Sequence, residues 1–329
     1  MKKISVRKSS GYALLMPAFF IFLAYSCSTE ANIQQILGKS AEAPVFLSLK
    51  TVSSTEILFS FSQPVRVASI NFSPALEVQS VEEGSAVKVN FAQGLEEGAK
   101  ITADIVVEDA EKNSLNVIVP FRARNNRMPV LAFNELRTEY SKPKTEFVEF
   151  LAQSGGNLGA LRLFIAGHSL TKPVYEFIPA EVKEGEYIVL HLRTVEEICA
   201  DETGADLAFS GGTEAQGDAR DFWLPGNTKL LHKTDALWLM DQDDRIIDSV
   251  LLCENNSEWG KFNSKEAAEF LALKGAWLSS AVSSAGTTNT RTICRDESIP
   301  RGSIAANWYI TATSSATPGK INNTKRYVP

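Results

Sequence analysis

The chain has 329 residues, of which 44% are hydrophobic, 22% are charged and 9% are aromatic. This is the composition of a globular protein with room for two domains, and it excludes a disordered chain or a fibrous repeat. The formal charge of -6 argues against a nucleic-acid-binding protein, because duplex binding depends on clustered Lys and Arg. With three histidines and four cysteines available, we expect no cofactor and no metal centre.

The amino terminus has the three-part pattern of a secretory signal. Lys2, Lys3, Arg7 and Lys8 precede an apolar stretch from Tyr12 to Tyr25. This stretch is shorter than the roughly 20 residues that a membrane-spanning helix needs. The sequence therefore predicts a signal peptide over residues 1–26.

The end of this stretch, Leu23-Ala24-Tyr25-Ser26-Cys27, resembles the lipobox of bacterial lipoproteins. In that family the cysteine becomes the lipidated first residue of the mature chain. The bulky Tyr25 departs from the strictest pattern and fits looser lipoboxes, such as those of spirochaetes. The resemblance implies that Cys27 carries acyl chains such as palmitate, and the alternative is an ordinary signal peptide cleaved nearby. Residues 27–43, mostly small or polar, are interpreted as a lipidated tether.

Residues 44–125 contain short runs of alternating apolar and polar residues, such as Ile57, Phe59 and Phe61. Six or seven such strands predict an antiparallel sandwich. The tracts FSFSQPV and GLEEGAKITADIVVEDAEKNSL resemble bacterial Ig-like domains. Some of these domains bind calcium in acidic turns, but Asp109 and Asn113 are a thin ligand set, so we favour a turn in which they bond the local backbone.

A basic, turn-rich break from Arg122 to Pro129 precedes a second domain, placed at 130–325. The segment resembles a lamin tail domain, itself an Ig-like sandwich, and it is longer than usual for that family. Two insertions, about Glu196–Asn227 and Cys253–Ala285, account for the extra length. The residues that carry the resemblance are Asn134, Glu135, Val148, Glu149, Asp248, Asn307, Trp308, Thr317, Pro318, Gly319 and Asn322.

The two insertions differ in pattern. The first is rich in Gly and polar residues and is predicted to be an irregular loop. The second contains NSKEAAEFLALKGAW, where Asn263 and Glu266 have the spacing of a capping box at the start of one short helix. We expect this helix to cover an open end or edge of the sandwich.

No motif predicts a catalytic centre. An EF-hand loop that started at Asp241 would have Arg245 among its alternating acidic positions and Leu252 at its Glu position, so a solvated hairpin turn is favoured. The GHSL segment at His168 lacks the second flanking Gly of a nucleophile elbow. Four carboxylates offer an acid/base pair in principle, but their match to family positions favours a structural role. They are Glu135, Glu149, Asp235 and Asp248.

The tryptophans divide into two groups. Trp238 and Trp308 are expected in the core. The other three fall in or beside the insertions and are candidate recognition residues, because function tends to gather on loops of a rigid scaffold. They are Trp223, Trp259 and Trp277.

Three cysteines remain after Cys27, and an exported compartment permits disulfides. Cys253 and Cys294 are the preferred pair, which leaves Cys199, although the sequence does not decide the pairing.

The sequence thus predicts an all-β protein of two antiparallel Ig-like sandwiches in tandem, with a short helix inserted in the second. The function predicted is non-catalytic: an exported, lipid-anchored module of the cell envelope, periplasm-facing or surface-exposed, that binds a protein or a glycan. Outer-membrane anchoring is expected, and nucleic acid is not an expected partner. The alternative is an accessory or cryptic hydrolase, because bacterial lamin tail domains often accompany secreted nucleases. The oligomeric state is not predicted.

Overall fold

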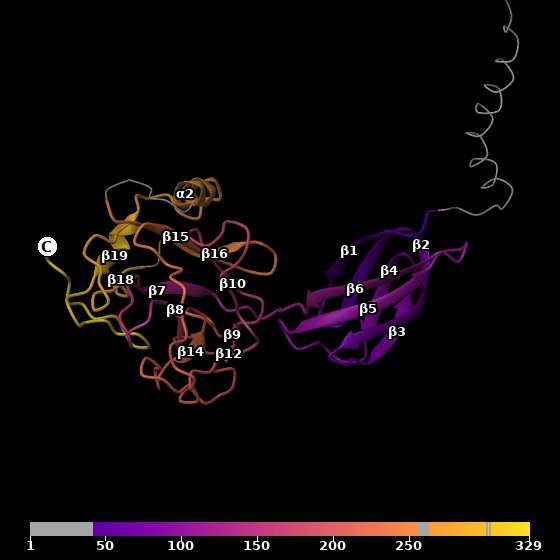
Figure 1. The fold of residues 1–329 in the computed structure, drawn as a ribbon, viewed down its shortest axis with the longest axis horizontal. Helices are drawn as coiled ribbons and strands as arrows, with labels where there is room; N and C mark the ends of the chain where they lie inside the picture. The colour runs from indigo at the N-terminus through magenta and orange to yellow at the C-terminus, as the bar shows by residue number, and fades with distance from the viewer. Residues whose placement is uncertain (1–41, 256–262, 301, 303) are drawn as a thin grey trace, which may run out of the picture.

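The structure, a computed structural model, describes residues 42–255, 263–300, 302 and 304–329. The predicted signal peptide, Cys27, most of the tether and Trp259 lie outside the described residues. Figure 1 shows two β domains side by side with a short link between them and one helix on the second domain. The predicted all-β class is confirmed. Within the described ranges, no helix is both long and apolar enough to span a bilayer.

The first domain is built around one long strand that takes part in two layers. The amino-terminal half of β2 pairs with β1 and β4, and its carboxyl-terminal half pairs with β5. The register shifts between Ser60 and Val65, where the strand crosses from one layer to the other. The strands are β1 (Phe46–Thr51), β2 (Glu56–Ser73), β3 (Val78–Glu82), β4 (Gly84–Phe91), β5 (Lys100–Glu108) and β6 (Ser114–Arg122).

Alternation in these strands separates a buried face from a solvated face, as a pleated strand requires. Ile57, Phe59 and Phe61 of β2 are buried, while the residues between them are partly exposed. The inward residues of β4 and β5 join them in one apolar core. The period-two pattern therefore identifies the core of this domain correctly.

The second domain packs two larger sheets against each other. One has the order β11-β10-β15-β16-β17, and the other has the order β14-β13-β8-β7-β18-β19. The strands are β7 (Leu131–Arg137), β8 (Phe147–Ala152), β9 (Gly156–Asn157), β10 (Arg162–Ile165), β11 (Tyr175–Glu176), β12 (Glu181–Val182), β13 (Tyr187–His191), β14 (Arg220–Trp223), β15 (Asp235–Met240), β16 (Ile246–Cys253), β17 (Val282–Ser283), β18 (Ile293–Arg295) and β19 (Trp308–Ile310).

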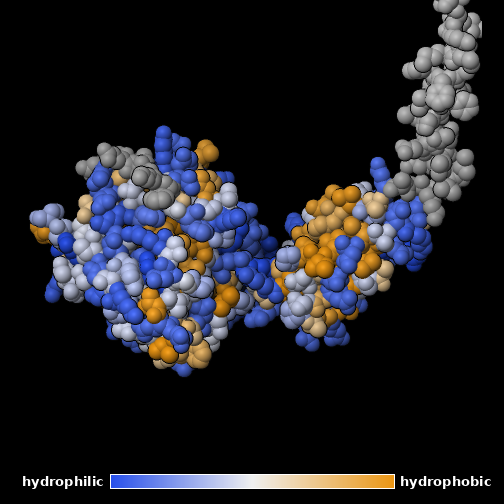
Figure 2. All heavy atoms as spheres, viewed as in Figure 1, coloured by the Kyte–Doolittle hydropathy of each residue, from blue (hydrophilic) through white to orange (hydrophobic). Residues whose placement is uncertain are grey.

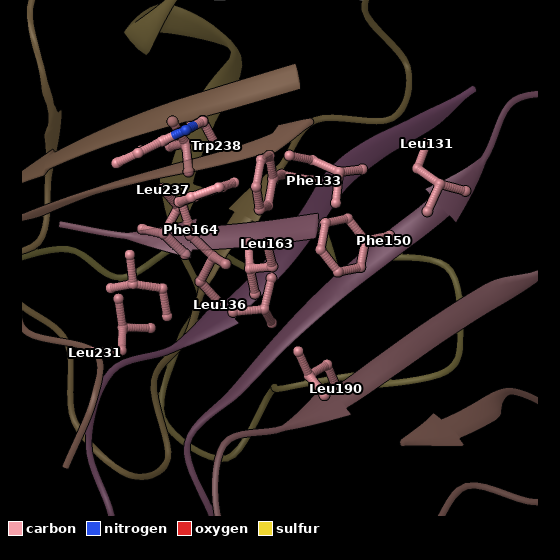
Figure 3. Close-up of a cluster of buried hydrophobic side chains, with 14 of the residues drawn as sticks. Leu131, Phe133, Leu136, Phe150, Leu163, Phe164, Leu190, Leu231, Leu237 and Trp238 are labelled. Atoms are coloured by element: carbon pink, nitrogen blue, oxygen red, sulfur yellow. The ribbon is translucent and has the colours of Figure 1, made fainter. Parts of the chain in front are cut away.

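The core of the second domain lies between these sheets. Figure 3 shows Phe133 of β7 and Phe150 of β8 packed together, with Leu163 of β10 beside them. Trp238 of β15 stacks on Phe164 with ring centroids 5.2 Å apart. The expected core position of Trp238 is confirmed.

The short helix predicted in the second insertion is α2 (Ser264–Leu273). The predicted capping box is wrong, because Asn263 adopts a left-handed conformation and makes no side-chain cap hydrogen bond. The helix buries Ala267 and Leu271 and packs against β15, a central strand. It therefore covers a sheet face, and the edge of β16 is covered instead by β17 of the same insertion.

The first insertion was expected to be irregular throughout, which is wrong at one point. Its end, Arg220–Trp223, forms β14, which pairs in parallel with β13. The burial of all four residues of β14 explains why they order as a strand.

The link between the domains is held by contacts to both sides. Asn125 exchanges two hydrogen bonds with Gln242, and its side-chain amide donates to the carbonyl oxygens of Asn157 and Gly159. Gly98 of the first domain lies directly against Gly159, where a Cβ on Gly98 would come within 2.4 Å of that backbone. Asn125 thus ties the link to the second domain, and Gly98 and Gly159 bring the two domains into direct contact.

Candidate functional site

The residues singled out around the lamin-tail-like pattern converge on one buried polar cluster. Glu135 of β7 and Glu149 of β8 lie opposite each other in the antiparallel register. Both side chains are fully buried. Asn134 donates its side-chain amide to Glu149 and to Glu297. The sequence motifs therefore mark one place in the fold.

This carboxylate cluster binds the carboxyl-terminal segment of the chain. Glu135 accepts hydrogen bonds from Thr292 and from the backbone N–H of Thr317. Glu149 accepts from the backbone N–H of Gly319. Buried carboxylates that accept backbone hydrogen bonds hold a segment in place, because an unmade bond to a buried charge is costly. The cluster fastens residues 317–319 onto the sheet.

A cavity of about 300 Å³ lies beside the cluster and is lined in part by Asn134, Arg295 and Glu297. Neither Glu135 nor Glu149 is among its lining residues. An acid/base pair must reach the proton that it transfers. The position of the two glutamates therefore favours the structural role expected for them.

Burial raises the pKa of Glu135 and raises that of Glu149 further, since the neighbouring Glu135 charge adds to the effect of burial at Glu149. The folded protein thus binds these protons more strongly than the unfolded chain does. Stability from this source is greatest below the ordinary glutamate pKa of about 4.5 and is lost as the pH rises above it toward the folded-state pKa.

We expect Glu149→Gln to flatten this pH dependence. Above pH 5 the wild-type protein should lose stability relative to the variant as the pH rises, because the neutral amide removes one ionisable group from the buried pair. Urea unfolding of both proteins from pH 5 to pH 8 measures the difference. If the free energies of unfolding of the two proteins changed in parallel with pH, the raised pKa of Glu149 would be contradicted.

Asp235 and Asp248 also bond the backbone. Asp235 accepts hydrogen bonds from the N–H groups of Gly167 and His232, and Asp248 accepts from the N–H of Phe133. Both carboxylates are buried. These contacts agree with the structural role expected for the two residues.

A second polar group lies at the end of β13. His191 contacts the hydroxyl of Thr145 at 3.2 Å and the carboxylate of Asp221 at 2.8 Å. The series of hydroxyl, imidazole and carboxylate resembles a catalytic triad, in which a base activates a nucleophile and a carboxylate orients the base. However, all three side chains are at most 1% exposed, and Trp223 stacks on the imidazole at 3.7 Å. A nucleophile must meet its substrate, so this arrangement serves packing.

Two of the three candidate recognition tryptophans are buried, so the prediction is wrong for them. Trp223 is 6% exposed because β14 carries it onto His191, and its indole N–H donates to Ser210. Trp277 is 2% exposed and belongs to the main core. Trp259 lies outside the described residues. Trp308, expected in the core, is buried, and the Arg295 guanidinium lies over its ring.

The preferred disulfide is absent: Cys199, Cys253 and Cys294, all within the described part of the chain, form no disulfide. Cys294 lies on β18 opposite Glu135, whereas Cys253 ends β16 in the other sheet. The prediction placed Cys253 at the end of the second hairpin strand and Cys294 on a late strand, but it did not anticipate that these strands belong to different sheets.

The two acidic turns behave as predicted. The carboxylate of Asp109 accepts from the backbone and the side chain of Asn113, which is the local turn that we favoured. Asp241 accepts from the backbone N–H groups of Asp243 and Arg245 in the β15–β16 hairpin. Among the described residues, no group of three or more His, Cys, Asp or Glu side chains is arranged to hold a metal ion.

The first insertion exposes two apolar side chains that the sequence analysis missed. Ile198 is 66% exposed and Phe209 is 64% exposed. A backbone hydrogen bond from the N–H of Gly211 to the carbonyl of Ile198 joins the two sides of this irregular loop. We call these two residues the 198/209 tip. Figure 2 shows apolar residues at the lower edge of the second domain, where the loops beside β14 lie in Figure 1.

The loop behind the 198/209 tip is tied to the sandwich. Glu202 is buried and accepts from the N–H groups of Ser210 and Asp221 with its two carboxylate oxygens. Arg220 donates to the carbonyl oxygens of Glu202 and Gly204. The tip is thus carried by a hydrogen-bonded framework. In the sequence, the available signal for the 198/209 tip was the presence of two hydrophobic residues in a polar, Gly-rich insertion.

The second insertion also exposes aliphatic residues. Leu273 at the end of α2 is 85% exposed and Leu278 is 78% exposed. They flank the buried Trp277, which anchors this turn through a hydrogen bond from its indole N–H to the carbonyl of Ser280. Single exposed leucines are common on protein surfaces, so no binding role is assigned to these two residues.

The fold and these surfaces define a two-domain β protein with a rigidly framed apolar loop on its second domain. Residues 129–310 match the family described as the TP_1001 protein second domain. The match spans more than half of the chain, so the chain belongs to this family.

A relative from Treponema pallidum (strain Nichols), described as an uncharacterized protein, is 30% identical over 240 residues. The alignment covers 69% of this chain but only 61% of the relative, so the chain spans less than two thirds of that protein.

Two solved structures show a distant likeness. A DUF4876 family protein from Bacteroides thetaiotaomicron is 12% identical with a TM-score of 0.31, and the match covers 88% of this chain and 96% of that one. The N-terminal part of the bacterial S-layer protein SbsC is 13% identical with a TM-score of 0.25, covering 73% and 50%. Both likenesses are too distant to inform the function of this chain.

Proposed function

We propose that the chain is a non-catalytic, lipid-anchored protein of the cell envelope that binds a protein partner through the 198/209 tip. The observation that carries the proposal is the exposure of Ile198 and Phe209, at 66% and 64%, on a loop held by buried hydrogen bonds. Aromatic residues at interfaces supply much of the binding energy when they fill a pocket on the partner. Framing them in advance lowers the ordering cost of binding.

The envelope location rests on the sequence. The signal pattern of residues 1–26 and the lipobox at Cys27 support export and lipidation, although both lie outside the described residues. Under this proposal the Ig-like and lamin-tail-like domains form a stalk and a head that the tether holds near the membrane. The burial of Glu135, Glu149 and His191 supports a binding role rather than hydrolysis.

A protein partner is favoured over a glycan. Sugar recognition by stacking needs exposed aromatic faces, and the structure buries Trp223 and Trp277. The tip instead offers one aliphatic and one phenyl side chain, which suit an apolar pocket. A tryptophan-based glycan platform is therefore not part of the proposal.

Saturable binding of the purified lipidated protein to isolated envelopes tests the proposal. Phe209→Ser should weaken binding by about 30-fold, the effect of losing a hot spot worth roughly 2 kcal/mol. Protease treatment of the envelopes should abolish binding, and periodate oxidation of their glycans should leave it intact.

Leu278→Ser is the matched control, because it also removes an exposed aliphatic side chain from an insertion. It should bind like the wild type. Binding that is sensitive to periodate, or equal binding by the Phe209→Ser protein, would overturn the proposal.

A further inference from the structure

The junction between the domains contains a cavity of about 380 Å³ to which both domains contribute. Ligand sites often occur at domain interfaces, and this volume lies within the usual range of small-molecule sites. Six charged residues are in its lining: Lys50, Arg122, Arg124, Arg162, Glu176 and Asp243. Four cations against two carboxylates leave the lining with an excess of two positive charges, although the whole chain is acidic.

The arginines of this cavity are only partly used by their protein partners. Arg122 donates from Nε to Glu176 and from Nη1 to the carbonyl of Gly98, but its buried Nη2 has no hydrogen-bond partner among the described residues. A guanidinium carries five N–H donors. Buried donors without partners are rare enough that each one calls for an explanation.

Arg162 shows the same pattern on the other domain. Its Nη2 donates to the Asp241 carbonyl and to Asp244, while its buried Nε has no partner in the described part of the chain. Asp244 is largely exposed and is not part of the cavity lining. Guanidinium groups from both domains therefore line this cavity.

Lys50 adds a positive charge outside the two-point ion pair of Arg124 with Asp243. Arg124 binds both carboxylate oxygens of Asp243, at 3.1 and 3.0 Å. Lys50 is close enough to Asp243 to contribute to the lowered pKa of that carboxyl, after the larger effect of the Arg124 hydrogen bond. Lys50 lines the cavity together with these arginines.

We propose that this junction cavity binds a phosphate monoester. The dianion carried by such a group near neutral pH matches the excess of two positive charges in the lining. The positively charged side chains of Arg122, Arg162 and Lys50 line the cavity and would face its oxygens, since guanidinium and phosphate geometry are complementary. Because the donors come from both domains, the ligand also holds the two domains together. This site is separate from the 198/209 tip, so either proposal can fail alone.

The test is calorimetric titration of the full-length mature protein with glycerol 1-phosphate at constant ionic strength, with sodium chloride as the blank. Lys50→Ala should weaken binding about tenfold, as expected for the loss of one charge-assisted hydrogen bond. Lys50→Arg should retain binding. Lys112→Ala is the matched control, because Lys112 is an exposed lysine of the first domain that pairs with Glu108 away from the cavity.

A second arm separates soluble esters from a lipid headgroup, using vesicles of phosphatidylcholine with and without phosphatidic acid. Lys50-dependent binding to the soluble ester or to the phosphatidic acid vesicles supports the site and assigns its source. Absence of binding in both arms would overturn it. So would equal affinity of the Lys50→Ala and Lys112→Ala proteins, whose melting temperatures without ligand provide the check on folding.

Discussion

Replacing Trp238 by alanine should lower the free energy of unfolding by roughly 3 to 5 kcal/mol, the loss typical of deleting a large buried aromatic side chain. Trp238 is 1% exposed, stacks on Phe164 and contacts Phe270 of α2. The change would leave a cavity between the sheet and the helix. Both elements would lose packing contacts.

Urea denaturation measures this loss, and Leu278→Ala is the control because Leu278 is 78% exposed. The control should change stability by less than about 0.5 kcal/mol. A loss below about 1 kcal/mol for Trp238→Ala would contradict the assigned core.

Replacing Arg193 by methionine should cost roughly 3 to 5 kcal/mol, because it leaves the carboxylate of Glu146 buried without its partner. The two side chains are 7% and 1% exposed and form a two-point ion pair. Arg193 also donates to Asn227 and lies over the ring of Tyr140. The pair joins the start of β8 to the end of β13.

A double-mutant cycle with Glu146→Gln tests this assignment. The double variant should recover part of the loss, because no uncompensated charge remains buried. Lys265→Met provides the exposed control: its pair with Glu269 spans 4.0 Å in solvent, and its loss should change stability by less than about 1 kcal/mol. Equal losses in the Arg193 and Lys265 variants would contradict the structure.

The first domain was predictable because its strands β2, β4 and β5 each bury one face. A pattern such as Ile57, Phe59 and Phe61 specifies the buried face, and a register slip would expose it. The second domain gave less signal of this kind, since strands such as β7 and β15 are buried along nearly their whole length. There the family resemblance, rather than periodicity, singled out Glu135 and Glu149, and their pairing across β7 and β8 appears in the structure alone.

The errors have physical causes that are non-local. Trp223 was expected at the surface because it falls in the first insertion, but pairing of β14 with β13 buries it. The helix start at Asn263 depends on a backbone conformation that residue spacing does not specify. Contacts at the domain junction, such as Arg124 with Asp243, join residues more than a hundred positions apart. No local pattern predicts such pairs.

Site-specific photo-crosslinking in living cells tests the central claim most directly. A benzophenone amino acid at position 209 should give one discrete protein adduct, which disappears when Ile198→Ser removes the other half of the tip. The same probe at position 278 should give no such adduct. No adduct from position 209, or the same adduct from both positions, would contradict binding through the 198/209 tip.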